Sequence, residues 1–296
     1  MRKTGLIDAA YVKTYLQKRD RQLHKGSCGK VLVVAGSLGM AGAAVLCARG
    51  ALRTGAGLVQ VSVPQELYPV IHAGVVEATC VSRRADDLDL DGYQAIAIGP
   101  GLGVRGKHGT LIERIMTEYG GTVVADADAL NELSRDERMM AITSASRRSC
   151  RLIVTPHPGE AGRLLGCSAK EINGCREDSA RRLAVKLNAV AVLKGPATVV
   201  ATPSGESYTN STGNPGMATG GSGDVLTGVI AALAGQGLEA LPAACCGVYL
   251  HGLAGDLGTG FWGEYGLMAS DIADSLALAL KQTVETEASP VENIGV

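Results

Sequence analysis

Short apolar runs alternate with longer segments of helical pattern along most of this chain. Runs rich in Val, Ile and Ala that end near Gly, Pro or an acidic residue are typical of buried strands, and they occur at 30–36, 58–64, 93–101, 121–131 and 151–160. Helical patterns occur at 41–55, 108–120, 158–166, 168–187, 223–235, 242–258 and 268–286. Residues 189–210 have the pattern of consecutive strands with turns at Gly195-Pro196 and Ser204-Gly205. The alternation predicts the α/β class, with a mostly parallel sheet covered by helices on both faces.

Glycine and polar residues gather where the predicted strands end. The segments concerned read "AGSLGMAG", "IGPGLG", "DADALN", "TPHPGE" and "LKGPAT". Because ligands of parallel sheets bind outside the carboxyl ends of the strands, we expect these segments to meet on one rim and form the site. No linker, low-complexity tract or internal repeat divides the chain, so we expect a single domain over residues 1–296.

The composition narrows the possible function classes. Aromatic residues make up only 3% of the chain and the net charge is −1, so neither the basic field nor the stacking platform of a nucleic-acid-binding protein is present. The N-terminus lacks the apolar stretch of a secretory signal, and no uninterrupted apolar run is long enough for a membrane span. Eight scattered cysteines without zinc spacing favour a reducing compartment. We therefore expect a cytoplasmic protein with no nucleic-acid or membrane partner.

Residues 101–106, "GLGVRG", match the spacing of the dinucleotide-binding fingerprint and follow a predicted strand. The chain holds 40 glycines, so one such match by chance is unsurprising. The next helix also begins too late for the fingerprint. A tight turn at the end of a strand is the favoured interpretation, and a hydride-transfer site is the alternative.

Residues 213–224, "GNPGMATGGSGD", carry more specific information. Backbone N–H groups of Gly220, Gly221, Ser222 and Gly223 can face one point beside a helix N-terminus, which predicts an anion hole for a phosphoryl group. Asp224 follows in the first turn of an apolar helix, where the helix end favours its ionised form. We interpret it as a general base facing a hydroxyl group. A simple capping acid is the alternative.

Several blocks in order also resemble one known family. They read "KGSCGKVLVVAGSLGMAGAAVLCARGALRTGAGLV", "IGPGLG", "VVADADALN", "TPHPGEAGRLLG", "VLKGPATVV", "NPGMATGGSGDVLTGVIAALAGQG" and "GVYLHGLAGDL". The chain resembles the ADP-dependent NAD(P)H-hydrate dehydratases of the ribokinase-like superfamily over about residues 25–275. The resemblance implies a three-layer α/β/α fold with a mostly parallel central sheet. It also implies a lyase for nicotinamide nucleotide repair, which dehydrates the S epimer of hydrated NADH or NADPH (NADHX, NADPHX) and converts ADP to AMP and phosphate.

The same resemblance implies roles for individual residues. Asp224 is the expected catalytic base and a substrate contact. Further substrate contacts are expected at Ala44, Gly103 and His157, with Ala43 adjacent to the first of them. The expected nucleotide-binding residues are Lys194, Gly195, Pro196, Ala197, Thr198 and Gly223. Asn131 and Glu160 are expected near the phosphates, where they would orient Mg²⁺ through water.

Simpler roles compete with these. Lys194 can be a surface lysine at a strand end, His157 a turn residue between two prolines, and Glu160 a first-turn acid. Asp126 and Asp128 are expected to cap or pair rather than to bind metal, because acids are common at such positions. His251 and Asp256 are expected to pack among the C-terminal helices.

The resemblance also concerns partners. Homotetramers are common in the family, and some members carry an additional epimerase domain. Only about 25 residues precede the first predicted strand, so the expectation here is a separate epimerase acting upstream. A ribokinase-like kinase for a small vitamin precursor is the alternative function, and a non-catalytic nucleotide sensor is a further one.

Overall fold

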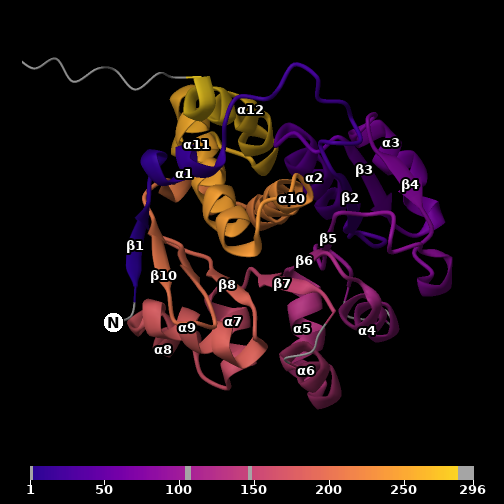
Figure 1. The fold of residues 1–296 in the computed structure, drawn as a ribbon, viewed down its shortest axis with the longest axis horizontal. Helices are drawn as coiled ribbons and strands as arrows, with labels where there is room; N and C mark the ends of the chain where they lie inside the picture. The colour runs from indigo at the N-terminus through magenta and orange to yellow at the C-terminus, as the bar shows by residue number, and fades with distance from the viewer. Residues whose placement is uncertain (1–2, 104–107, 146–148, 286–296) are drawn as a thin grey trace, which may run out of the picture.

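The computed structural model describes residues 3–103, 108–145 and 149–285, and their strands form one ten-stranded sheet (Figure 1). The strand order is β1-β10-β9-β8-β7-β6-β5-β2-β3-β4. Only β9 runs antiparallel to its neighbours, which confirms the mostly parallel sheet. The bounds are β1 Thr4–Ile7, β2 Lys30–Val34, β3 Leu58–Ser62, β4 Thr79–Val81, β5 Ala95–Ile98, β6 Thr122–Ala125, β7 Arg151–Val154, β8 Val190–Leu193, β9 Val199–Ala201 and β10 Ser207–Asn210.

Helices cover both faces of this sheet, so the three-layer α/β/α architecture is also confirmed. One face carries α1 Ala9–Tyr15, α2 Ala41–Arg53, α3 Tyr68–Gly74, α10 Ser222–Gly235, α11 Ala240–Gly266 and α12 Ala269–Glu285. The other face carries α4 Gly109–Glu118, α5 Ala127–Arg135, α6 Glu137–Ser144, α7 Pro158–Leu165, α8 Ala169–Gly174 and α9 Arg176–Leu187. Three short 3₁₀ helices lie in loops, at η1 Gln65–Leu67, η2 Ala85–Asp87 and η3 Pro215–Met217.

Strand β2 shows how the two hydrophobic cores arise. Val31 and Val33 face the core under α2 and α10, whereas Leu32 and Val34 face the core on the opposite side. Successive strand side chains point to opposite faces, so a strand buried on both sides must be apolar throughout. This explains why the central strands have continuous apolar sequences rather than alternating ones.

Helix α10 is the most centrally placed helix in Figure 1, and nearly all of its residues are buried. It packs against α2 and α11 and against the central strands. Its contact with α2 is close, because a methyl group on Gly228 would lie 2.0 Å from the carbonyl oxygen of Cys47. An apolar helix pressed between a sheet and two helices has a fixed N-terminus, which suits a site built there.

Three sequence expectations need correction. The first 25 residues are not a plain leader to the first strand, because they include β1, which pairs in parallel with β10, and α1. Residues 121–131 are not one strand: β6 ends at Ala125 and α5 begins at Ala127, in a segment of good helix formers. The helix expected at 168–187 is two helices, because Cys175 after Asn173-Gly174 has non-helical dihedral angles.

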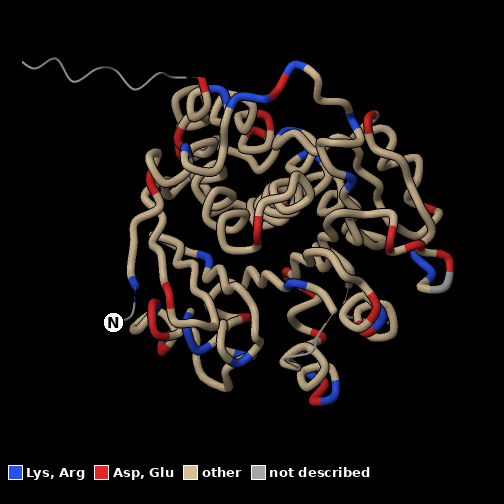
Figure 2. The backbone as a smooth tube through the Cα atoms, in the orientation of Figure 1, with Lys and Arg blue, Asp and Glu red and all other residues tan. Residues whose placement is uncertain are grey.

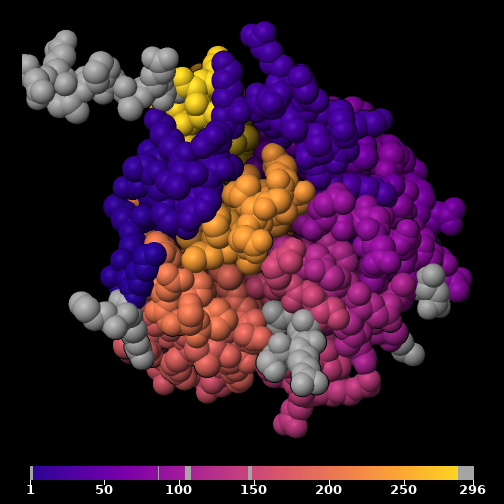
Figure 3. All heavy atoms as spheres, viewed as in Figure 1, coloured from indigo at the N-terminus to yellow at the C-terminus, as the bar shows by residue number. Residues whose placement is uncertain are grey.

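The N-terminal segment lies beside the C-terminal helices, although the two ends of the described chain lie apart (Figure 1). Figure 3 shows indigo N-terminal residues beside the orange and yellow C-terminal helices, and α1 packs against α11 and α12. Charged residues of both signs are interspersed around the periphery, while α10 and α11 are almost free of them (Figure 2). Within the described residues, no helix combines the length and hydropathy that crossing a bilayer requires.

Candidate active site

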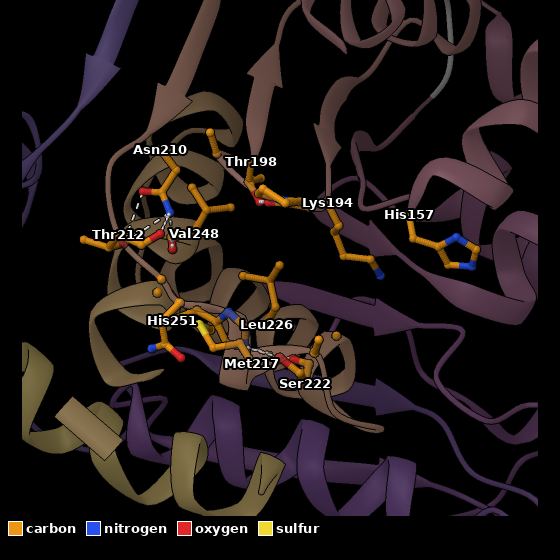
Figure 4. Close-up of a pocket in the computed structure, with 18 of the residues that line it drawn as sticks. His157, Lys194, Thr198, Asn210, Thr212, Met217, Ser222, Leu226, Val248 and His251 are labelled. Carbon is orange, nitrogen blue, oxygen red and sulfur yellow. Dashed lines mark hydrogen bonds between the residues drawn. The ribbon is translucent and has the colours of Figure 1, made fainter. Parts of the chain in front are cut away.

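A cavity of about 750 Å³ lies at the carboxyl end of β8 (Figure 4). All five residues of the segment from Lys194 to Thr198 line it, as do Ser222 and Gly223 at the start of α10. Its size is within the usual range for small-molecule sites. The sequence therefore anticipated one wall of a cavity that the fold does form.

Further lining comes from Asn210 on β10 and Val248 on α11, which the sequence did not connect with a site. Together with Val248, Met217 in η3 and Leu226 on α10 supply apolar surface. Asn210 at the end of β10 donates from Nδ2 to the carbonyl oxygens of Val248 at 3.2 Å and Thr212 at 3.1 Å. A mostly apolar cavity with a few fixed polar groups suits a planar heterocycle joined to a polar tail.

The glycine-rich stretch is anchored at both ends. Near its start, the carboxylate of Asp256 accepts from the backbone N–H of Gly213 and from Nδ2 of Asn214, both at 2.9 Å. Asn214 in turn caps η3. At its end, Gly221 has a φ of +91°, a conformation that glycine adopts without strain, and α10 begins at the next residue. Asp256 therefore holds the glycine loop, in addition to packing with the C-terminal helices.

His251 on α11 fixes the first residue of α10. Its Nε2 lies 2.9 Å from the carbonyl oxygen of Ser222 and 3.3 Å from the Ser222 hydroxyl. Burial lowers the pKa of His251 to about 4, with a smaller contribution from the charge of Lys194. A carbonyl oxygen only accepts, so Nε2 carries the proton of a neutral imidazole. His251 was expected to pack, and it does so as part of the cavity wall.

Lys194 is not a surface lysine, because its ammonium group points inward and binds a buried carboxylate. Nζ lies 2.6 Å from Oδ1 of Asp126, while the hydroxyl of Thr227 donates to Oδ2 of Asp126 at 2.9 Å. Burial alone would lower the pKa of Lys194, but the nearby carboxyl groups of Asp126, Glu160 and Asp224 together outweigh it and raise the pKa. The amine is therefore a fixed positive charge beside the start of α10.

Asp224 is half-buried in the first turn of α10 and does not line the cavity. A methyl group on Gly221 would lie 3.8 Å from its Oδ2 atom. The expectation that the helix end keeps this carboxyl ionised needs correction. Burial first and the nearby carboxylate of Asp126 second raise its pKa to about 7, although Lys194 opposes them. Asp224 can therefore exchange a proton at neutral pH.

The loops that follow β2 and β5 lie together on the same sheet edge. The backbone N–H of Gly36 donates to the carbonyl oxygen of Pro100 at 2.7 Å, and the N–H of Gly103 donates to Oδ2 of Asp128 at 2.8 Å. Ala44 is fully buried in α2, whereas Ala43 is half-buried and faces Gly101. The residues after Gly103 that complete "GLGVRG" lie outside the described part of the chain.

His157 and Glu160 form the start of α7. The His157 side chain accepts from the backbone of Gly159, and Oε2 of Glu160 accepts from the backbone of His157 at 2.9 Å, which completes a capping box. Burial raises the pKa of Glu160, with Lys194 acting in the opposite direction. His157 also lines the cavity (Figure 4). Both residues thus stabilise the N-terminus of α7.

Asn131 is less suited to a metal than Glu160. Its Oδ1 atom already accepts from Nη2 of Arg163 at 2.8 Å and from Nε at 3.1 Å. Among the described residues, no three His, Cys, Asp or Glu side chains are grouped closely enough to hold an ion directly. The Oε2 atom of Glu160 likewise accepts from the backbone of His157, and its Oε1 lies 3.4 Å from Nε2 of His157. A Mg²⁺ ion that keeps its waters and binds mainly to phosphates needs only one or two carboxylates.

These parts gather around one helix terminus. Lys194, Ser222 and Gly223 line the cavity, whereas Asp224 does not line it and lies near Gly221. The N–H group of Ser222, expected in the anion hole, instead donates to the carbonyl oxygen of Thr219 at 3.4 Å. Such an arrangement can hold an anionic donor in the cavity and pass a group across the helix terminus to an acceptor beside the carboxyl.

Comparisons with known proteins agree with this geometry. The profile of the NAD(P)H-hydrate dehydratase family matches residues 31–277. The ADP-dependent (S)-NAD(P)H-hydrate dehydratase of Neisseria meningitidis is 41% identical over 264 residues, which cover 86% of each chain. The ADP/ATP-dependent NAD(P)H-hydrate dehydratase of Bacillus subtilis, crystallised with ATP and Mg²⁺, superposes with a TM-score of 0.85 at 34% identity and covers 94% of this chain and 98% of that one.

A longer relative shows the same similarity. The bifunctional NAD(P)H-hydrate repair enzyme of Moorella thermoacetica is 42% identical over 293 residues, which cover 95% of this chain. The chain spans about half of that relative, 54% of its length. The resemblance and the fold class inferred from the motifs are thus confirmed, and the small-molecule kinase is not favoured. The chain belongs to the NAD(P)H-hydrate dehydratase family.

Proposed function

We propose that this chain dehydrates the S epimer of NADHX and NADPHX, consumes ADP as co-substrate and releases AMP and phosphate. The observation that carries the proposal is the placement of a half-buried carboxyl, Asp224, and a fixed cation, Lys194, at the N-terminus of the same helix. Family membership and the names of its relatives support the substrate and the donor. The chain is then a lyase of nicotinamide nucleotide repair.

In the first step, the hydroxyl group of the hydrated nicotinamide ring attacks the β-phosphorus of ADP. The P–O bond to AMP breaks, and Asp224 accepts the hydroxyl proton. A pKa near 7 lets the carboxyl be ionised before the attack and protonated after it. The N–H groups at Gly220, Gly221 and Gly223 and the ammonium of Lys194 would stabilise the negative charge of the moving phosphoryl group.

In the second step, phosphate leaves the ring. The ring nitrogen pushes its electron pair toward the carbon that bears the phosphate, the C–O bond breaks, and loss of the neighbouring ring proton restores NADH or NADPH. Hydrated dinucleotide and ADP thus give dinucleotide, AMP and phosphate, and the atoms balance. Phosphorylation is useful because phosphate leaves more readily than hydroxide.

The cavity would bind the nucleotide. The segment from Lys194 to Thr198 would hold ADP together with Gly223, and the apolar wall at Leu226 and Val248 would contact the adenine. On the other side of α10, Gly103 and Ala44 or Ala43 would contact the dinucleotide, with His157 at the edge. Mg²⁺ would neutralise phosphate charge when bound, held through water by Glu160 and, less favourably, by Asn131.

Assembly and location form part of the same proposal. Residues 1–296 would act as one domain in a homotetramer in the cytoplasm. Large exposed side chains at the end of α11, Phe261, Trp262 and Tyr265, support association with another copy. The eight cysteines are thiols, which supports a reducing compartment. An NAD(P)HX epimerase would supply the S epimer, as the bifunctional names of longer relatives suggest.

Incubation with NADHX and ADP tests the activity. Absorbance at 340 nm should recover, with one AMP and one phosphate released per NADH formed. No recovery with NADHX or NADPHX would contradict the proposal. A phosphorylated organic product without regained absorbance would instead indicate a small-molecule kinase.

A further inference from the structure

Two carboxylates are buried among the described residues, Asp126 and Glu160. Glu160 completes a capping box, but Asp126 has a different use for its charge. Only 1% of Asp126 is exposed, and it occupies the N-cap position of α5. Its side chain makes no capping hydrogen bond to that helix. An aspartate at this position usually caps its own helix, so the absent cap calls for another explanation.

The carboxylate of Asp126 instead joins two other elements. Oδ1 accepts from Lys194 at the end of β8 over 2.6 Å, and Oδ2 accepts from Thr227 on α10 over 2.9 Å. The charged atoms of Lys194 and Asp126 lie next to Gly223. A methyl group on Gly223 would lie 3.1 Å from Nζ of Lys194 and 3.6 Å from Oδ2 of Asp126. The ion pair between Lys194 and Asp126 therefore lies next to the backbone of the predicted anion hole.

The backbone around Asp126 is held tightly in this arrangement. Ala127 has a φ of +47°, which is disfavoured for a residue with a Cβ atom. Gly99 approaches so closely that a methyl group there would lie 1.8 Å from the Asp126 carbonyl oxygen. Strain of this kind persists where surrounding structure requires it, and it is common at functional sites.

We propose that Asp126 is a positioning residue for phosphoryl transfer, which holds the ammonium of Lys194 against the first turn of α10 where the transferred group passes. The inference rests on the proposed function. A lysine side chain is flexible and carries three donors. Bound to Asp126, it keeps two donors for phosphate oxygens in a fixed direction. Thr227 orients the carboxylate, and Asp126 itself touches no reactant.

The negative charge of Asp126 and its hold on Lys194 should affect ADP binding and turnover differently. The negative charge of Asp126 repels a bound phosphate, so its removal should not weaken ADP binding. The loss of a fixed cation should slow transfer, because positioned charge acts mainly in the transition state. Damage to the fold would weaken both. A fall in kcat without a weaker ADP affinity therefore separates positioning from damage to the fold.

The experiment compares Asp126→Asn, Lys194→Met and the double variant. Asparagine keeps the shape of Asp126, and its oxygen can still accept from Lys194, while its NH₂ group can donate to the Thr227 hydroxyl, which also lies within bonding distance of the Gly223 carbonyl oxygen. The double variant avoids an unpaired buried charge. Asp126→Asn should lower kcat at least tenfold and leave the calorimetric Kd for ADP within threefold or tighter. When Lys194→Met is already present, the addition of Asp126→Asn should change kcat less than twofold. Thr227→Val should lower kcat three- to tenfold at unchanged Kd.

Asp274→Asn is the matched control, because Asp274 is an ion-paired carboxylate on α12 that does not line the cavity. Its kcat should stay within twofold of wild type. Wild-type kcat in Asp126→Asn, or equal losses with and without Lys194, would overturn the inference.

A turnover-free measurement separates this inference from the proposed function. AMP with aluminium fluoride mimics the phosphoryl group in transfer. Asp126→Asn and Lys194→Met should each weaken that complex at least tenfold relative to AMP alone, and the double variant should be no weaker than Lys194→Met. If the wild type does not restore NADH but shows this pattern, the proposed function is wrong and the positioning role stands. Unchanged binding of the mimic in Asp126→Asn would overturn the positioning role.

Discussion

The Nε2–H group of His251 donates to the carbonyl oxygen of Ser222 over 2.9 Å, so the middle of α11 is tied to the first residue of α10. The predicted anion hole thus depends on a residue that is 29 positions away in the sequence. The imidazole is neutral near pH 7, because burial of the ring penalises its charged form and lowers its pKa.

Acid should therefore destabilise the fold through His251. Its folded pKa of about 4 is below the unfolded value, so the unfolded state binds a proton first as pH falls from about 6.5 toward 4. His251→Gln keeps an N–H donor and does not titrate. Between pH 7 and pH 5, urea unfolding of the wild type should lose up to about 2 kcal/mol more than the variant. Parallel pH curves for the two proteins would contradict this role.

Three neighbouring glycines should respond differently to alanine. Gly220 has open space around it, and Gly221 has a φ of +91° and would place an added methyl group 2.4 Å from Cδ1 of Leu46. At Gly223, the added methyl group would meet Lys194. Gly220→Ala should change stability by less than about 0.5 kcal/mol, whereas Gly221→Ala should cost about 1–3 kcal/mol. Gly223→Ala should fold but lose at least tenfold in kcat. Thermal unfolding and the 340 nm assay separate the three outcomes, and equal effects at Gly220 and Gly223 would argue against the anion hole.

Asp224→Asn should abolish turnover, because asparagine cannot accept the hydroxyl proton. ADP binding, measured by calorimetry, should persist. In the wild type, kcat/KM should rise with pH through about 7 as the carboxyl ionises. Turnover near the wild-type rate in the variant would exclude Asp224 as the base.

Asp224 should also make stability depend on pH, but in the opposite direction from His251. The folded pKa of Asp224 is raised, so its contribution to stability is complete below the unfolded pKa and is lost as pH rises through about 7. Asp224→Asn should therefore be more stable than the wild type at pH 8, by on the order of 1–2 kcal/mol after allowing for solvent screening. The difference should vanish near pH 4. Equal unfolding curves at pH 8 would show that burial does not penalise this carboxylate.

Glu160 and Glu171 provide a matched test for the metal. Each completes a capping box, at α7 and α8 respectively. Glu160→Gln and Glu171→Gln should each cost about 1 kcal/mol or less. Only Glu160→Gln should raise the Mg²⁺ concentration for half-maximal turnover, by at least tenfold, and EDTA should stop turnover in all three proteins. An unchanged Mg²⁺ requirement in Glu160→Gln would remove that residue from the metal's surroundings.

Local pattern was sufficient for the elements that are long or strongly apolar. The central strands and α2, α10 and α11 could be predicted because burial on every side leaves a continuous apolar sequence. Strand β1 could not be predicted, because four residues at a sheet edge are too few to show a hydrophobic period. Its partner β10 is also about two hundred residues away.

The residues of the candidate site were also predictable only where the signal is local. The glycine loop and "KGPAT" are local signals, and the cavity contains both. Asp126 and His251 act through contacts with distant segments, so their residue types alone suggest a cap and a packed ring. The pKa of Asp224 depends on how deeply α10 is set between its neighbours, which no local pattern records.

Strand β1 has a consequence for the integrity of the protein in storage and handling. It covers the outer side of β10, the strand that ends at Asn210 in the cavity wall. Proteolytic trimming of residues 1–7 would leave the backbone of Ser207–Asn210 unpaired along its outer side. Exposed strand edges pair readily with other chains. The first sign of such trimming should therefore be aggregation through this edge, with ADP affinity declining as the cavity wall loses its support.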